Sequence, residues 1–265
     1  MPPRAGSEAV NLMGRLGYGA RGVVYFLVGA SAAIAAMRPG HRPAGPTDAL
    51  QLGHGHPIGA LFLLLVAFGL ACLAGWFTVA GLATARQGGG RSWWRGIGML
   101  GDAVVYIAFM IDVAGIAFGV WHGAGDRNLQ SWTAWVSAHG YGRVLIGIAG
   151  VAVLAGGIGL LVWGLIGDVD KGVSLTATEK RLVRPIARYG IAGRGAAIAL
   201  VGAYLIAAAA YGNPREAHEV GGVLAALRGA PYGRALIGLF GLAFIGSSLF
   251  DFVAALFRRF DPQNP

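Results

Sequence analysis

The chain has 265 residues, of which 55% are hydrophobic and only 12% are charged, and its mean hydropathy is +0.61. A soluble domain of this size cannot bury so much apolar surface in one core, so the composition excludes a soluble globular class and indicates a protein of the lipid bilayer. The net charge of +9 is typical of loops that meet anionic lipid headgroups, and no basic, aromatic-rich segment predicts binding to nucleic acid.

Six apolar runs follow one another along the chain, each close to the roughly 20 residues that a membrane-spanning helix needs. The N-terminal residues MPPRAGSEAV contain no compact apolar core with a cleavage site, so we expect the first run to be retained as a helix. The 46 glycines suit membrane helices, whose backbones pack closely at small residues. We predict a single membrane domain over residues 1–265, with helices at about 16–37, 57–82, 97–121, 141–165, 187–211 and 232–257.

Lys and Arg are unevenly distributed between the two sets of alternating loops. They are more frequent in the two terminal segments and the 83–96 and 166–186 loops than in the 38–56, 122–140 and 212–231 loops. Basic residues stay preferentially on the cytoplasmic side of a membrane. The sequence therefore predicts a multi-pass protein of the bacterial inner (plasma) membrane with its N- and C-termini in the cytoplasm.

A short motif occurs three times, near the start of every second apolar run. Arg15–Tyr25 reads RLGYGARGVVY, Arg188–Ile198 reads RYGIAGRGAAI, and Gly96–Tyr106 reads GIGMLGDAVVY. Self-similarity of this kind indicates an internal repeat. We therefore expect an all-α integral membrane protein with six transmembrane helices. They form three parallel two-helix repeats, at about 13–82, 95–165 and 186–257, around a pseudo-threefold axis normal to the membrane.

The three loops on the predicted outer side each contain a short, apolar-faced stretch before the next helix. These stretches are Thr47–Gly53, Leu129–His139 and Glu219–Leu227. Such stretches are typical of short helices that lie in the membrane interface. We expect them to cap the bundle.

The repeated pattern Arg-x-Gly-x-x-x-Arg-Gly-x-x-Tyr, followed by a loop, a Pro-Tyr-Gly-Arg turn and a Gly-rich helix, resembles the bacterial membrane-protein family called domain of unknown function 1206. The resemblance extends from about residue 13 to residue 257. It implies the fold of tandem two-helix repeats and implies no activity. The chain departs from the pattern at Asp102, which replaces the motif arginine, and at Ala60, where the later repeats have Arg143 and Arg234. These departures weaken any shared ligand role for the arginines.

Four charged residues fall inside the predicted helices at one depth. Arg21, Asp102 and Arg194 occupy the same motif position, and Asp251 lies at a similar distance from the cytoplasmic end of the last helix. An unpaired charge at the centre of a membrane helix costs at least about 2.5–3.5 kcal/mol. One interpretation is a structural clamp of ion pairs. The other is a cytoplasmic gate that opens when the pairs exchange partners.

Asp112 stands midway along the third apolar run and has no charged counterpart in the other repeats. A carboxyl group at the membrane midplane indicates a step in which a proton or cation binds, because desolvation favours its protonated form. The alternative is a protonated carboxyl that forms a hydrogen bond to a neighbouring helix.

The histidines His54, His56 and His139 are the candidates for a metal site, because His54 and His56 form a close pair and His56 aligns with His139. No Cys or Glu lies at ligand spacing, so we expect solvated loop histidines and neither a metal nor another cofactor. The single Cys72 lies inside the second apolar run and is interpreted as a small core residue. No serine elbow, phosphate-binding loop or His-Glu-x-x-His pair is present, so we expect no enzyme.

These features favour a non-enzymatic structural or accessory subunit whose Gly-rich helices pack against lipid, a second copy or a larger membrane complex. The alternative is a small transporter or channel with a path along the pseudo-threefold axis, gated by the layer of Arg and Asp. A sealed axis filled with small residues would favour the first function, and a polar cavity that reaches Asp112 would favour the second. A third, weaker hypothesis is a haem or quinone redox protein.

Overall fold

The structure, a computed structural model of the whole chain, describes residues 5–38, 40–51, 57–120, 125–168, 177–258 and 260. Within these ranges the chain is helical and forms no β-strand. Six helices are long and apolar enough to cross a membrane, so the six predicted helices are confirmed. They are α1 (Ala5–Met37), α3 (Pro57–Arg86), α4 (Gly90–Ala117), α6 (Gly142–Ile166), α7 (Ala177–Tyr211) and α9 (Gly233–Phe257).

Helix α7 is longer than the apolar run that predicts it. It begins ten residues earlier than expected and continues through Pro185. The added turns contain Lys180, Arg181 and Arg184, so hydropathy cannot detect them. Apolar length therefore predicts the part of a helix that fits a membrane, and a polar extension has to be found by other means.

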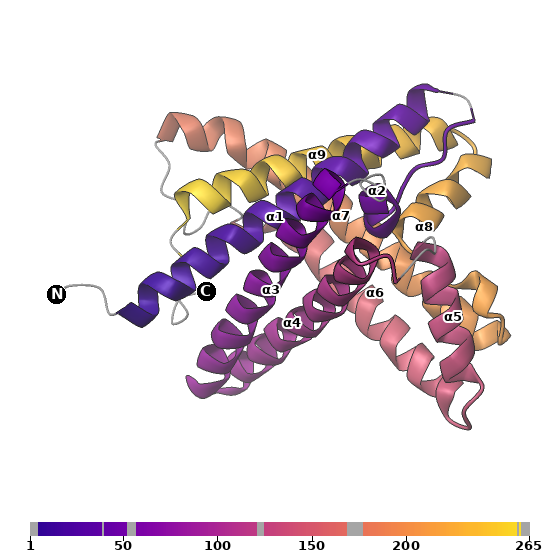
Figure 1. Cartoon of the computed structure of the whole chain (residues 1–265), viewed down its shortest axis with the longest axis horizontal. Coiled ribbons are helices and arrows are strands. Elements are labelled where there is room, and N and C mark those ends of the chain that lie inside the picture. Colours follow the sequence, from indigo (N-terminus) through magenta and orange to yellow (C-terminus); the bar gives the residue numbers. More distant parts are fainter. Residues whose placement is uncertain are drawn as a thin grey trace.

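Three short helices lie at one end of the molecule and form what we call the cap (Figure 1). They are α2 (Pro46–Gln51), α5 (Gly125–Ser137) and α8 (Val220–Ala226), and each contacts the other two. Two short 3₁₀ helices, η1 (Pro214–Glu216) and η2 (Leu227–Gly229), flank α8. The prediction of three short helices in these loops is confirmed. The first turn of α1 and the last turn of α9 lie at the opposite end from the cap (Figure 1).

The long helices are arranged as three closely packed pairs, α3 with α4, α6 with α7 and α9 with α1. Facing glycines bring the backbones together in each pair. A Cβ atom added to Gly29 would lie 2.8 Å from the carbonyl oxygen of Gly241, one on Gly81 would lie 3.1 Å from that of Gly96, and one on Gly202 would lie 2.9 Å from that of Gly150. Small residues are the usual means by which membrane helices approach this closely.

Two junctions join the three pairs, one between α1 and α3 and one between α7 and α9. The same repeat positions form both junctions. Gly17 packs on Leu73 in the first, and Gly190 packs on Ser247 at the corresponding positions of the second. One helical turn away, Ala20 meets Gly69 in the first, and their counterparts Gly193 and Ala243 meet in the second. The two repeats therefore share their helix packing in detail.

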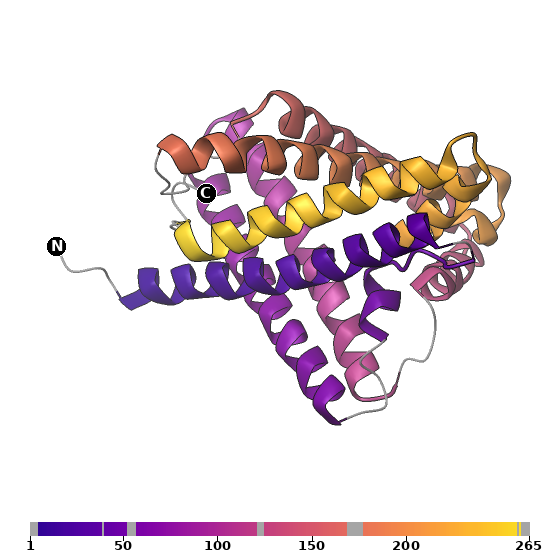
Figure 2. The ribbon, with the colours of Figure 1, turned by 90° about the horizontal axis from the view of Figure 1, so that it is seen from above.

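A third junction comparable to these two is not formed between α4 and α6 over their described length. The packing order is α6–α7–α9–α1–α3–α4, so the two helices of the middle repeat are the two edges of the array. Figure 1 shows α4 and α6 diverging below the α1–α9 pair, and Figure 2 shows the α3–α4 pair running across the α1–α9 pair while α7 lies alongside α9. A threefold axis that relates all three repeats stays a prediction.

The main hydrophobic core surrounds α1, which packs against both α9 and α3. Val24, Val28, Leu63 and Leu70 are almost completely buried there, together with Phe244 of α9. By contrast, few residues of α4 and α6 are buried within the chain. Helices α1 and α9 therefore form a rigid centre on which the charged residues are held.

Candidate functional site

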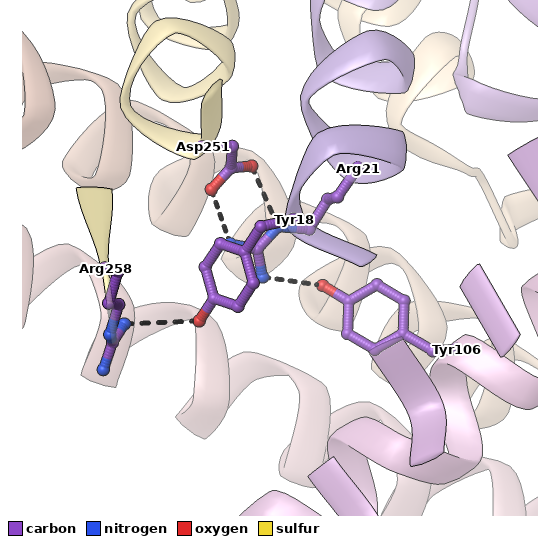
Figure 3. Close-up of polar contacts among 5 residues, drawn as sticks. All are labelled: Tyr18, Arg21, Tyr106, Asp251 and Arg258. Carbon is purple, nitrogen blue, oxygen red and sulfur yellow. Dashed lines mark hydrogen bonds and ion pairs between the residues drawn. The ribbon is translucent and has the colours of Figure 1, made fainter. Parts of the chain in front are cut away.

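A buried ion pair links the first long helix to the last. The Nε atom of Arg21 donates to Oδ2 of Asp251 at 2.9 Å, and its Nη2 atom donates to Oδ1 at 2.5 Å (Figure 3). The two residues are 6% and 1% exposed. Two parallel hydrogen bonds between a guanidinium and a carboxylate give a strong and geometrically specific contact. The pair fixes how α1 and α9 face each other.

Tyrosines complete the surroundings of Arg21. Its Nη1 atom donates to the hydroxyl of Tyr106 on α4 at 3.2 Å, and the guanidinium lies over the ring of Tyr18 at 4.2 Å (Figure 3). Arg258 donates to the Tyr18 hydroxyl at 3.4 Å. Phe77 of α3 stacks on Tyr106 with ring centroids 5.5 Å apart. Arg21 therefore connects three helices, α1, α9 and α4, at a single depth.

The other two members of the predicted charge layer are not joined in this way. Asp102 is exposed on α4 and forms no ion pair with the described residues, although its charge lies within electrostatic range of Arg21 and Arg194. Arg194 is 8% exposed, its guanidinium lies 5.1 Å from the ring centroid of Tyr25, and its Nε atom has no hydrogen-bond partner among the described residues. The structure thus brings two of the four charges into contact and keeps two apart.

The repeat positions explain this difference. Asp251 of α9 corresponds to Phe77 of α3 and to Leu160 of α6. Helix α7 packs on α6, so the position from which Asp251 reaches Arg21 is occupied by a leucine beside Arg194. The signal is present in the sequence when α3, α6 and α9 are aligned with one another. It is not present in the motif shared by α1, α4 and α7.

A second polar cluster lies where the cap meets α4. The Oγ1 atom of Thr47 lies 3.0 Å from Oδ2 of Asp112 and 3.3 Å from Oε1 of Glu219, and Nδ2 of Asn128 donates to Oδ1 of Asp112 at 3.4 Å. Thr47 and Asn128 belong to α2 and α5, and Glu219 precedes α8. All three cap segments therefore contribute one polar side chain to the surroundings of Asp112.

This cluster can hold a proton. Thr47 offers two donors, its hydroxyl and its backbone N–H, which donates to Oε1 of Glu219 at 3.5 Å, and a proton on one of the two carboxyl groups adds a third. Burial raises the pKa of Glu219 to about 8, and the negative charges of Asp48 and Asp112 act in the same direction. Glu219 is therefore the group that carries the proton at neutral pH. Sequence reasoning identified Asp112 and missed Thr47, Asn128 and Glu219, whose shared feature is their place at or near the start of a cap helix.

The candidate metal ligands are not brought together. His54 and His56 lie outside the described residues, and the Nδ1 atom of His139 lies 2.9 Å from the carbonyl oxygen of Trp135, whose ring packs on the imidazole. Among the described side chains, no group of three His, Cys, Asp or Glu residues is placed to hold a metal ion. Cys72 is buried and unbridged.

Two hollows lie on the surface at the cap end. Arg228, Tyr232 and Arg234 line one of about 540 Å³, and Arg127, Gln130 and Arg215 line one of about 390 Å³. Neither lining includes Asp112 or a member of the charge layer.

On the exposed faces of α4 and α6 lie the residues that align with those of the two packed junctions. Gly98 and Gly101 of α4 stand at the positions of Gly17 and Ala20, and Ala152 and Gly156 of α6 stand at the positions of Gly69 and Leu73. All four residues are exposed, and a Cβ atom added to any of the three glycines would meet no other atom of the described chain within 4 Å. We call these four residues the seam. Residues that pack helix on helix in two repeats are thus uncovered in the third.

The six apolar helices and the intramembrane ion pair define a multi-pass helical membrane protein. The model of the family described as Domain of Unknown Function (DUF1206) matches residues 16–84 and 189–258, more than half of the chain, and the chain belongs to this family. The family resemblance seen in the motif is confirmed. The matched stretches contain the two packed junctions, and the middle repeat between them is not matched.

A relative from Bacillus subtilis (strain 168), described as "Uncharacterized protein YxxB", is 26% identical over 255 residues, which cover 94% of this chain and 92% of the relative. The likeness therefore includes the middle repeat as well as the two matched stretches. No solved structure matches the chain.

Proposed function

We propose that this protein is a non-enzymatic structural or accessory subunit of the membrane, and that it assembles by receiving a transmembrane helix of another chain at the seam. One observation carries the proposal. The repeat positions that pack helix against helix between α1 and α3 and between α7 and α9 are small and uncovered on α4 and α6.

The physics of helix association in lipid supports this role. Lipid tails are as apolar as Leu or Val, so membrane helices gain little from hydrophobic burial and associate through close packing at small residues. Gly98 and Gly156 offer the close approach that Gly17 and Gly190 use in the packed junctions. A helix of another chain would find the same kind of surface on α4 and on α6.

The remaining parts of the proposal concern placement. The distribution of Lys and Arg supports a bacterial inner-membrane location with both termini in the cytoplasm. The cap then lies on the outer side and the Arg21–Asp251 pair near the cytoplasmic side. The three helix pairs and their matching glycine contacts support a pseudo-threefold relation among the repeats, with the third junction left for the partner.

Site-specific photo-cross-linking in living cells tests the proposal. A photoreactive amino acid replaces Val105 of α4 or Ile148 of α6, which lie one turn from the seam on the same faces and are each 62% exposed. We expect protein cross-links from both positions. The controls replace Phe68 of α3 and Leu239 of α9, exposed residues away from the seam, and we expect these to cross-link lipid alone. Equal protein cross-linking at all four positions, or none at any, overturns the proposal.

A small transporter is the second candidate function, and the carboxyl cluster favours it. Asp112 and Glu219 share the Thr47 hydroxyl in an arrangement that binds a proton. The test is proton flux in vesicles that contain the wild-type protein or the Asp112→Asn variant. Flux that is absent from the wild type, or unaltered in the variant, removes this residue from any transport mechanism.

A further inference from the structure

We infer that the helix received at the seam belongs to a second copy of this chain, with α4 of each copy packed on α6 of the other. This inference rests on the proposed function and names the partner. It follows from the repeat positions at the seam, the length of the cap helices, the symmetry of the resulting contact and the charges beside it.

The seam contains both halves of one junction. In the two packed junctions, the positions of Gly98 and Gly101 meet the positions of Gly156 and Ala152, and do not meet copies of themselves. The complement of the α4 face is therefore a surface of the α6 type. A second copy of this chain supplies that surface with the required residues at the required spacing.

The cap explains why the chain does not close the junction on itself. The helix that connects α4 to α6 is α5, with 13 residues, whereas α2 has 6 and α8 with the 3₁₀ turn η2 that continues it spans Val220–Gly229. At 1.5 Å per α-helical residue and 2.0 Å per 3₁₀ residue, α5 is about 20 Å long, α2 is about 9 Å long and α8 with η2 is about 16 Å long. Helix α5 therefore acts as a spacer that holds α6 away from α4 and leaves both faces for another molecule.

A twofold arrangement uses both faces of both copies. When α4 of the first copy packs on α6 of the second, a twofold axis places α4 of the second on α6 of the first. The contact closes after two molecules, and no seam is left to recruit a third. The expected assembly is therefore a dimer and not an open chain of molecules.

The charges beside the seam supply an independent reason for a partner there. Asp102 is exposed next to Gly101 on a helix that faces lipid, and Arg194 is 92% buried nearby with an unsatisfied Nε atom. A helix packed over the seam removes Asp102 from lipid, where its charge is costly, and leaves it within electrostatic range of Arg194 and Arg21. The layer of two arginines and two aspartates then balances inside the assembly.

Disulfide cross-linking between separate copies tests the inference. In a Cys72→Ala background, one copy carries Gly101→Cys and another carries Ala152→Cys, because a Cβ at these positions meets its counterpart directly in both packed junctions. We expect mild oxidation to produce a covalent dimer when the two variants are expressed together, and at least ten times less from either alone. The matched control pair, Phe68→Cys with Leu239→Cys, is expected to remain monomeric.

The outcomes separate the inference from the proposed function. If Val105 and Ile148 cross-link to a different protein and no disulfide-linked dimer forms, the proposed function still holds. The inference that the partner is a second copy of this chain is then overturned. A disulfide within one molecule that carries both cysteines also overturns it, because the chain then closes on itself. Native mass spectrometry of the wild-type protein provides a readout that does not depend on cysteine variants. A dimer that Gly98→Leu with Gly156→Leu converts to monomer supports the inference, and a wild-type monomer overturns it.

Discussion

Removing one partner of the Arg21–Asp251 pair tests whether the charge layer acts as a clamp. The substitution Asp251→Asn keeps the size of the side chain and removes its charge. Arg21, which is 6% exposed, then loses its counterion and keeps only a neutral amide oxygen at position 251, the Tyr106 hydroxyl and the Tyr18 ring as partners. A buried cation that loses its counterion keeps the full penalty of desolvation.

The structure sets the size of the expected effect. Both side chains are more than nine-tenths buried and share two hydrogen bonds of 2.9 Å and 2.5 Å, so breaking the pair should cost about 3–5 kcal/mol. Replacing both partners, as in Arg21→Met with Asp251→Leu, should cost less than about 1.5 kcal/mol, because a pair of apolar residues leaves no uncompensated charge. Leu160 at the position of Asp251 in the middle repeat shows that the fold accommodates leucine there.

Reversible unfolding in mixed micelles measures both variants, with tryptophan fluorescence as the signal. Trp76 packs edge-on to Tyr18 with ring centroids 6.0 Å apart and reports directly on the region. The expected order of stability is wild type, double variant, single variant. A single variant that loses less than about 1 kcal/mol, or a double variant as unstable as the single, would refute the clamp.

Three further predictions follow from the cap and the helix pairs. Because its folded pKa of about 8 lies above the ordinary value of 4.5, Glu219 stabilises the cap fully below about pH 4.5 and progressively less up to about pH 8. The protection of the α8 amides against hydrogen exchange, corrected for the intrinsic pH dependence of the exchange rate, should fall over this window in the wild type and stay constant in Glu219→Gln. Asp112→Leu removes the acceptor used by Thr47 and Asn128 and should loosen α2 by about 1–3 kcal/mol, which exchange of the α2 amides measures against an unchanged α9. Gly202→Leu, which forces a side chain onto the backbone of α6, should cost at least about 1–3 kcal/mol in thermal unfolding, whereas Gly159→Leu on an open face should cost less than about 1 kcal/mol; equal losses would contradict the close packing of α6 and α7.

The six long helices were predictable because each needs only a run of apolar residues of membrane length, and no competing structure satisfies its backbone in lipid. The pairing of the helices was not predictable in the same way. Helices such as α3 and α6 are apolar nearly all round, so no hydrophobic periodicity identifies the face that packs. Only the positions of glycines such as Gly17 and Gly190 indicate that face, and their meaning becomes clear once Leu73 and Ser247 are seen opposite them.

The sequence indicates how far along each helix the charged residues lie, but not which neighbouring helix their side chains face. Counting along the repeats places Arg21, Arg194 and Asp251 at one level, but a position along an axis does not say which way a side chain points around the helix. The contact between Arg21 and Asp251 depends on the pairing of α1 with α9, the two most distant helices in the sequence. Glu219 was overlooked for a related reason, because a loop residue gains its altered chemistry only when the cap buries it against Thr47.

The differences among the repeats are concentrated in the middle one, and they occur together. It has Asp102 where the others have arginine, exposed small residues where the others have packed junctions, and a cap helix of 13 residues. The first and third repeats need only each other to form the rigid centre around α1 and α9. The departures of the middle copy therefore lie outside this packed centre. Because the departures of this copy lie on and beside the exposed faces of α4 and α6, those faces are where a specific function of the protein is expected to reside.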